Sequence, residues 1–180
     1  MKSKTRSKTP PAPTPRTPSR EGIRTILVPL DFSDASRKAL VYASWFAGQF
    51  GARLTLLHVI EPAGTPAFDK TSPAMPEREI VLERCRTELE SIVEQEGIKP
   101  KLVERIDIRF GRSYGEIVDT ARMLNIDLII ISTHGYTGWK RTIFGSTTER
   151  VVQQAPCPVL VVREHEKEFV PTLAKPASKA

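Results

Sequence analysis

The stretch Ile129–Val162 reads IIISTHGYTGWKRTIFGSTTERVVQQAPCPVLVV and carries the strongest fold signals in the chain. An apolar run typical of a buried strand stops at Ser132, and a loop containing Gly135 follows. Nine residues separate Gly135 from Gly145, and Ser146 then opens a predicted helix. Unpaired amides at a helix N-terminus attract anions. The stretch therefore predicts a site for the phosphates of a nucleotide.

Strands and helices alternate in the sequence on both sides of this loop. Short apolar or alternating runs predict strands, and stripes of apolar residues at helical spacing predict helices. The predicted strands are Thr25–Pro29, Leu54–Ile60, Val103–Phe110, Leu128–Ser132 and Val159–Val162. The predicted helices are Ala35–Phe50, Glu77–Gln95, Ser113–Leu124 and Thr147–Gln154.

This alternation predicts the α/β fold class, because parallel strands need crossover connections. We expect a single open, doubly wound, five-stranded parallel sheet of order 3-2-1-4-5, Rossmann-like, with helices on both faces. Ligands bind where such an order reverses, beyond the carboxyl ends of strands one and four. Asp31 follows strand one and Ser132–Gly135 follow strand four, so motif and topology select the same crevice.

The charge of the chain is concentrated at its N-terminus. The formal net charge is +6, but residues 1–20 hold six of the 27 basic residues and no acidic one, which leaves 21 basic against 21 acidic residues. We expect a disordered basic Pro/Ser/Thr-rich tail at 1–20, an α/β domain at 21–164 and a C-terminal tail at 165–180. A neutral domain is not expected to bind nucleic acid.

Other features narrow the class of protein. The apolar runs are far shorter than a membrane span, and the N-terminal segment lacks the apolar region of a secretory signal. Cys85 and Cys157 have neither metal-ligand spacing nor a disulfide pattern. We therefore expect reduced thiols, a cytoplasmic location and no contact with a membrane.

Motifs for several kinds of chemistry are absent from the sequence. There is no Walker loop, no dinucleotide fingerprint after the first strand and no Gly-x-Ser-x-Gly nucleophile turn. His58, His134 and His165 have no recognisable acid partner. No catalytic residue and no protein metal ligand is predicted.

Five short motifs stand out between about Ile23 and Arg163: Val28-Pro29-Leu30-Asp31, Leu57-His58-Val59, Thr133-His134-Gly135, Gly145-Ser146 and Ala155-Pro156-Cys157-Pro158-Val159. Together they resemble the motifs of the universal stress protein family. The ATP-binding members of that family share Gly-x-x-Gly, nine residues, then Gly-Ser/Thr. This chain departs from the pattern at the first position, where Ser132 stands in place of glycine. The β-carbon and hydroxyl of Ser132 would either crowd the ribose or supply one more hydrogen bond.

The resemblance implies an ATP site, with Mg²⁺ or Mn²⁺ held mainly by phosphate oxygens and water. It places the Asp31 carboxylate on the nucleoside and the backbone of Val59 on the adenine edge. The nucleotide-binding residues that it implies are Pro29, Asp31, Val59, Ile131, Ser132, Gly135, Gly145, Ser146 and Thr147. Lys140 and Arg141, in the loop, are candidates for the outer phosphates.

Some of these residues also have purely structural interpretations. Asp31 is a candidate cap for the following helix, as are Ser33 and Asp34, and Ser146-Thr147-Thr148-Glu149 has the pattern of a capping box. Ser113-Tyr114-Gly115-Glu116 has the same pattern and predicts another helix start.

The sequence favours an ATP-binding regulatory protein of the stress response. Two alternatives remain: a nucleotide-free dimeric interaction module, and a slow ATPase or autophosphorylating enzyme. We expect a homodimer through Val159–Val162, because an apolar strand at a sheet edge favours pairing across a two-fold axis. The resemblance implies the same mode of dimerisation.

Overall fold

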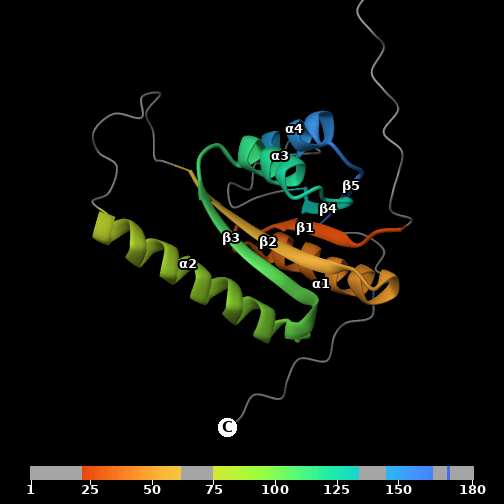
Figure 1. Ribbon diagram of the computed structural model, residues 1–180, viewed down its shortest axis with the longest axis horizontal. Coiled ribbons are helices and arrows are strands. Elements are labelled where there is room, and N and C mark those ends of the chain that lie inside the picture. The colour runs from red at the N-terminus through yellow and green to blue at the C-terminus, as the bar shows by residue number, and fades with distance from the viewer. Residues whose placement is uncertain (1–21, 62–74, 134–144, 164–169, 171–180) are drawn as a thin grey trace, which may run out of the picture.

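The computed structural model describes residues 22–61, 75–133, 145–163 and Val170, so the predicted tails lie outside the described residues apart from Val170. Five strands form one sheet in the order β3-β2-β1-β4-β5, and every pairing is parallel (Figure 1). The predicted order and fold class are confirmed. The strands are β1 (Thr25–Pro29), β2 (Arg53–Ile60), β3 (Val103–Phe110), β4 (Leu128–Ser132) and β5 (Val159–Val162). The helices are α1 (Asp34–Phe50), α2 (Met75–Gln95), α3 (Ser113–Met123) and α4 (Ser146–Gln154), with a 3₁₀ turn η1 at Pro100–Leu102.

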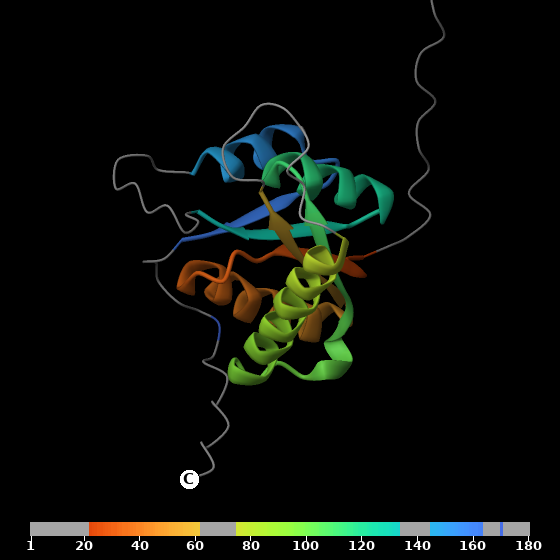
Figure 2. The same cartoon turned by 90° about the vertical axis from the view of Figure 1, so that its left-hand side faces the viewer.

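Helices cover both faces of the sheet, α1 and α2 on one side and α3 and α4 on the other (Figures 1 and 2). Successive residues of a strand point to opposite faces. Ile26 of β1 accordingly packs in one core with Leu40 of α1 and Leu89 of α2. The next residue, Leu27, packs in a second core with Ile117 of α3. The central strands are therefore buried on both sides, which explains their continuous apolar runs.

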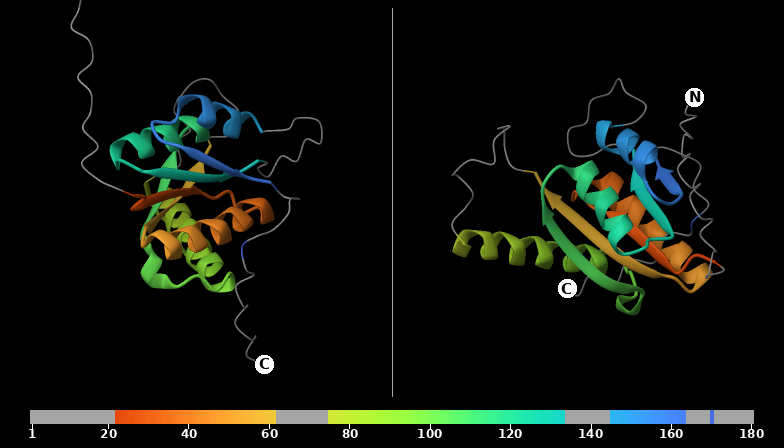
Figure 3. Two further views of the ribbon diagram at one scale, coloured as in Figure 1. Left: turned by 90° about the vertical axis from the view of Figure 1, so that its right-hand side faces the viewer. Right: turned by 45° about the horizontal axis from the view of Figure 1, so that its top comes forward.

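The two edges of the sheet differ in character. β3, predicted as an exposed or edge strand, is one edge and bears charged residues such as Arg105 and Asp107, whose side chains approach within 3.6 Å. β5 is the other edge; it has only apolar residues, and Val162 alone among them is fully buried. Figure 3 shows β5 on the far side of β4 from the rest of the sheet.

The ends of α1 follow the expected chemistry. Ser33 is the N-cap, and its hydroxyl accepts a hydrogen bond from the Ser36 amide at 3.2 Å. Gly51 ends the helix in the left-handed conformation, with φ 67°, as the sequence predicts. Along the predicted stripe, Ala39 and Ala43 are fully buried, whereas Phe50 is half exposed.

α2 begins at Met75, two residues before the predicted start, and among residues 78–95 its buried side chains lie in the second half. Leu89 and Ile92 are fully buried, but Ile80 is 67% exposed. The reason is geometric: the N-terminal half of α2 projects past the sheet (Figure 1). Gly97, with φ 65°, turns the chain after the helix.

Candidate functional site

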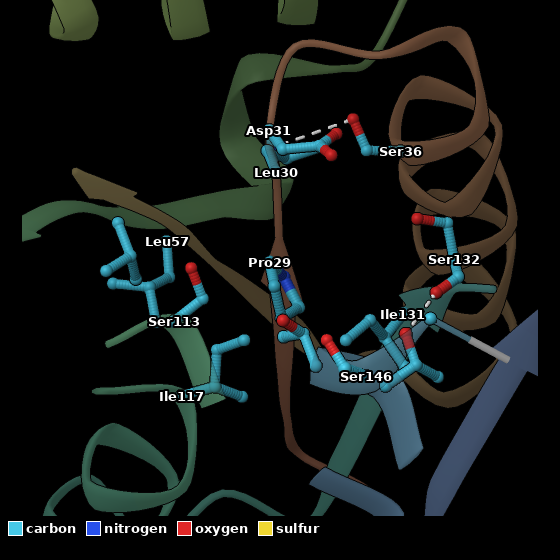
Figure 4. A pocket seen from close by; sticks show the side chains of 14 residues that line it. Pro29, Leu30, Asp31, Ser36, Leu57, Ser113, Ile117, Ile131, Ser132 and Ser146 are labelled. Carbon is cyan, nitrogen blue, oxygen red and sulfur yellow. Dashed lines mark hydrogen bonds between the residues drawn. The ribbon is translucent and has the colours of Figure 1, made fainter. Parts of the chain in front are cut away.

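A cavity of about 150 Å³ lies at the carboxyl ends of β1, β2 and β4, where the strand order reverses (Figure 4). This is the position at which doubly wound sheets bind ligands. Residues from three strands and three helix starts line it: Pro29, Leu30, Asp31, Ser36, Leu57, Val59, Ser113, Ile117, Ile131, Ser132, Gly145, Ser146, Thr147 and Thr148.

Asp31 organises the turn between β1 and α1. Its Oδ1 accepts hydrogen bonds from the backbone amide of Ser33, at 3.1 Å, and from the Ser33 hydroxyl. Its own amide donates to the hydroxyl of Ser36 at 3.4 Å. The carboxylate therefore holds the turn, whereas Ser33 caps the helix. Asp31 remains half-buried and lines the cavity.

His58 of β2 supports this turn on both sides of Asp31. Its Nδ1 lies 2.8 Å from the carbonyl oxygen of Leu30. Because a carbonyl only accepts, that nitrogen carries the proton. The imidazole also packs on the ring of Phe32, with 4.2 Å between centroids. Phe32 has φ 68°, a left-handed conformation that costs a residue with a β-carbon about 1–3 kcal/mol and is concentrated at ligand sites.

The start of α4 is tied to the end of β4 at two points. The hydroxyl of Thr148 donates to the carbonyl of Ser132 at 2.7 Å, and both residues are buried. The amide of Gly145 donates to the carbonyl of Thr133 at 2.7 Å. These two bonds fix the first turn of α4 against the cavity.

The predicted capping box at Ser146 is wrong. Gly145 is the N-cap, and Ser146 is already the first residue of α4, exposed at the cavity. The cap makes no side-chain hydrogen bond. The first amides of an α-helix have no acceptor within it, so those of Ser146 and Thr147 are suited to an anion.

The predicted capping box at Ser113 is also wrong. Arg112 is the N-cap of α3 and makes no side-chain cap, and Ser113 is the first helical residue. The amide of Ser113 donates instead to the Glu61 carboxylate at 2.7 Å, from the end of β2. Glu116 lies 3.7 Å from Arg109 rather than completing a box.

Of the nine predicted nucleotide-binding residues, the structure brings eight together at one cavity. Pro29, Asp31, Val59, Ile131, Ser132, Gly145, Ser146 and Thr147 line the cavity. Gly135, Lys140 and Arg141 lie outside the described residues. Sequence reasoning did not single out Leu30, Ser36, Leu57, Ser113, Ile117 and Thr148 as lining residues. The pattern at Ser113 predicted a helix start rather than a ligand contact, and Ile117 belongs to none of the quoted motifs.

Three further findings concern metal ions, thiol chemistry and membranes in the described part of the chain. Among residues 22–61, 75–133 and 145–163, no three His, Cys, Asp or Glu side chains lie together to hold a metal ion. Burial raises the pKa of the Cys157 thiol to about 11, and the nearby Asp127 carboxylate adds to the rise, so this cysteine is a poor nucleophile. No helix within these ranges has the length and apolarity to cross a membrane.

Fold and cavity together define a doubly wound α/β protein with a ligand cavity at the switch point of its sheet. The model of the universal stress protein family matches residues 22–163, the whole α/β domain. The chain belongs to the universal stress protein family.

Individual relatives support this assignment. The chain is 32% identical to a universal stress protein of Methanocaldococcus jannaschii over 153 residues, covering 81% of this chain and 85% of that protein. It is similar in structure to the universal stress protein UspA of Lactobacillus plantarum, with a TM-score of 0.64 and 28% identity, over 80% of this chain and 100% of the other. A universal stress protein solved in complex with cAMP has a TM-score of 0.53 and 20% identity, over 79% of this chain and 98% of the other, and this likeness is one of fold alone.

Proposed function

We propose that this protein binds ATP in the cavity between β1 and β4 and acts as a nucleotide-dependent regulator in the stress response. The observation that carries the proposal is the convergence of Asp31, Ser132 and the first turn of α4 on one cavity. Asp31 lies about 100 positions before Ser132 and the first turn of α4, and its carboxylate and the free amides of that turn are of the kinds that suit a nucleotide.

The division of the cavity into two ends supports a nucleotide over a simple anion. Leu57 of β2 and Ile117 of α3 lie on one side of the cavity and give it an apolar lining that suits a nucleobase (Figure 4). The Asp31 carboxylate is suited to accept hydrogen bonds from ribose hydroxyls. The first amides and hydroxyls of α4 suit the phosphates.

The conformation of Gly145 gives independent support. Its φ of −64° and ψ of 151° are open to any residue, so the backbone does not require glycine there. A close approach of ligand to the backbone is a sufficient reason for the absence of a side chain.

Magnesium or manganese accompanies the phosphates in this proposal. The described residues form no metal cluster of their own, so the ion would be held by phosphate oxygens and water. Hydroxyls of Ser146 and Thr147 line the cavity and are chemically suited to complete such a shell.

Two known complexes are compatible with this proposal. One universal stress protein was solved with cAMP and another, from Archaeoglobus fulgidus, with dAMP. Their identities to this chain are 20% and 22%, so the likeness is one of fold, and the argument for ATP rests on the cavity.

The proposal also includes a cytoplasmic homodimer. Cys85 and Cys157 are free thiols, as a reducing compartment allows. The apolar edge of β5 is the proposed dimer contact. The nucleotide-free module is the second candidate function, and it is favoured by Ser132, whose side chain occupies a cavity-lining position.

Calorimetric titration of ATP with Mg²⁺ separates these functions. The expected result for the wild type is micromolar binding, roughly −8 kcal/mol. Gly145→Val is the blocked-site control, since valine adopts the observed backbone angles and projects a side chain at the cavity.

A second variant, Ser132→Gly, makes the test decisive. Binding by Ser132→Gly but not by the wild type would show that Ser132 closes the site, and would favour the nucleotide-free module. Binding by neither protein would reject an ATP site in this cavity. Phosphate release that accompanies binding and is lost with Asp31→Ala would favour the slow ATPase.

A further inference from the structure

We propose that Ser113, at the start of α3, hydrogen-bonds the edge of the nucleobase and so contributes to base selection; this rests on the proposed nucleotide site. Ser113 lines the cavity with Ile117, one helical turn further along the same helix. In Figure 4 these two residues lie on one side of the cavity with Leu57, while Ser36 and Ser132 lie on the opposite side. Ser113 is therefore a polar group on the apolar side.

The hydroxyl of Ser113 has no structural task among the described residues. A serine at the start of a helix commonly caps it through its side chain. Here Arg112 occupies the cap position without a side-chain hydrogen bond, and the Ser113 amide is satisfied by Glu61 at 2.7 Å. Capping therefore does not use the hydroxyl, which stays directed to the cavity.

The position of Ser113 is fixed by its surroundings. The Glu61 carboxylate holds its amide from the end of β2. Ile117 is only 3% exposed in the core that α3 shares with the sheet. The next residue after Ser113, Tyr114, lies under the guanidinium of Arg150 of α4, 4.7 Å from the ring centroid. A hydroxyl held in this way meets a base at little entropic cost.

The groups on the other side of the cavity leave the nucleobase as the part of the ligand that the Ser113 hydroxyl contacts. The phosphates are accounted for by the first amides of α4, and the ribose by Asp31, so the remaining part of an adenine nucleotide faces α3. A serine hydroxyl both donates and accepts, and each edge of a purine offers an acceptor nitrogen or an amino group. One neutral hydrogen bond of this kind corresponds to a change in affinity of about 2- to 10-fold.

The test uses ATP, adenosine and inorganic tripolyphosphate as separate probes in calorimetric titrations. Ser113→Ala should weaken ATP and adenosine by the same factor, about 3- to 10-fold. Its affinity for tripolyphosphate should equal that of the wild type. Ser146→Ala, at the start of α4, should show the reverse pattern, with tripolyphosphate weakened and adenosine unchanged.

A matched pair of substitutions separates the hydrogen bond from the shape of the side chain. Ser113→Thr and Ser113→Val have the same shape, and only the threonine keeps a hydroxyl. We expect threonine to retain adenosine affinity within about 2-fold and valine to lose as much as alanine does.

Several outcomes would overturn the inference. Equal affinities of the threonine and valine variants would show that the hydroxyl is not used. A loss confined to tripolyphosphate would place Ser113 at the phosphates instead. Absence of ATP and adenosine binding in the wild type would reject the proposed function itself, whereas wild-type binding unaffected by Ser113→Ala would reject this inference alone.

Discussion

At the scale of single residues, Asp31 combines a structural role with the proposed contact to the nucleoside. Its carboxylate holds the turn into α1 through the Ser33 amide at 3.1 Å. His58 braces the same turn from β2, through the Leu30 carbonyl and the Phe32 ring. Replacing Asp31 by alanine would therefore disturb the turn as well as any ligand contact. A substitution that keeps the acceptor is needed to separate the two.

Asp31→Asn meets this need, because the amide oxygen still accepts from Ser33 while the charge is lost. A hydrogen bond to a charged group contributes about 1.5–3 kcal/mol, against about 0.5–1.5 for a neutral one. We expect ATP affinity to fall about 10-fold, with less than about 1 kcal/mol lost from the free energy of unfolding. Calorimetric titration and urea denaturation measure the two quantities.

Asp34→Asn is the matched control for this prediction. Asp34 is exposed at the first residue of α1, and it is not among the residues that line the cavity. The Asp34→Asn substitution removes the same charge near the same helix end. If direct contact at Asp31 matters, ATP affinity should therefore change by less than about 2-fold in this variant. Equal losses of ATP affinity in both variants would mean that Asp31 acts only through the electrostatic field of its charge.

Motif spacing predicted the strand-end residues of the cavity but not its α3 wall. Asp31 and Ser132 follow buried strands, whose ends meet at the switch point whatever the details of packing. Ser113 reaches the cavity because Glu61, 52 residues earlier, fixes the first turn of α3. An interaction over that separation leaves no local pattern in the sequence.

At the scale of elements, one of the two hydrogen bonds that attach α4 to the end of β4 comes from a buried hydroxyl. Thr148 donates to the Ser132 carbonyl at 2.7 Å, and removal of the hydroxyl would break this buried hydrogen bond. α3 contains the opposite case: Thr120 is fully buried, and its hydroxyl has no hydrogen-bond partner among the described residues. The two threonines therefore form a natural comparison.

We expect Thr148→Val to lower the free energy of unfolding by about 0.5–1.5 kcal/mol, the net contribution of one hydrogen bond. Thr120→Val, the same change of atoms, should be neutral or stabilising, because an unpaired hydroxyl is replaced by a methyl group. Urea denaturation of both variants checks the prediction. Destabilisation of the two variants by equal amounts would contradict it, since shape rather than hydrogen bonding would then be responsible.

The two wrong capping boxes show where local patterns fail at this scale. Ser113 and Ser146 each precede an acidic residue by three positions, as a capping box requires, yet both are already helical. For α4, the preceding Gly145 is also an accepted N-cap, so the pattern alone is ambiguous by one residue. The hydrogen bond from the Gly145 amide to the Thr133 carbonyl selects Gly145 as the N-cap, and that bond depends on tertiary structure.

At the scale of the whole molecule, the difference between the two sheet edges determines which one is suited to a second copy. β3 carries charges along its length, with Asp107 between Arg105 and Arg109, and such charges protect an edge from pairing. β5 has no charged residue, and three of its four side chains are only partly buried. The proposed homodimer therefore pairs through β5.

The hydrogen bonds of β5 identify the residue that tests this dimer. Carbonyls of Pro158 and Val162 accept from β4 amides at 3.0 Å, so residues at this spacing of two face β4. Val161 is out of phase with these residues, so its amide points away from β4, toward the outer edge of the sheet. Val161→Pro removes that outward donor and leaves the bonds to β4 in place.

We expect Val161→Pro to be a folded monomer at concentrations where the wild type is a dimer, measured by size-exclusion chromatography with light scattering. Val161→Thr is its control, because threonine keeps the amide and the branched shape and should remain dimeric. Circular dichroism and ATP titration should show that the monomer retains its fold and cavity. A proline variant that still dimerises would exclude pairing through β5, and a monomeric wild type would exclude the homodimer altogether.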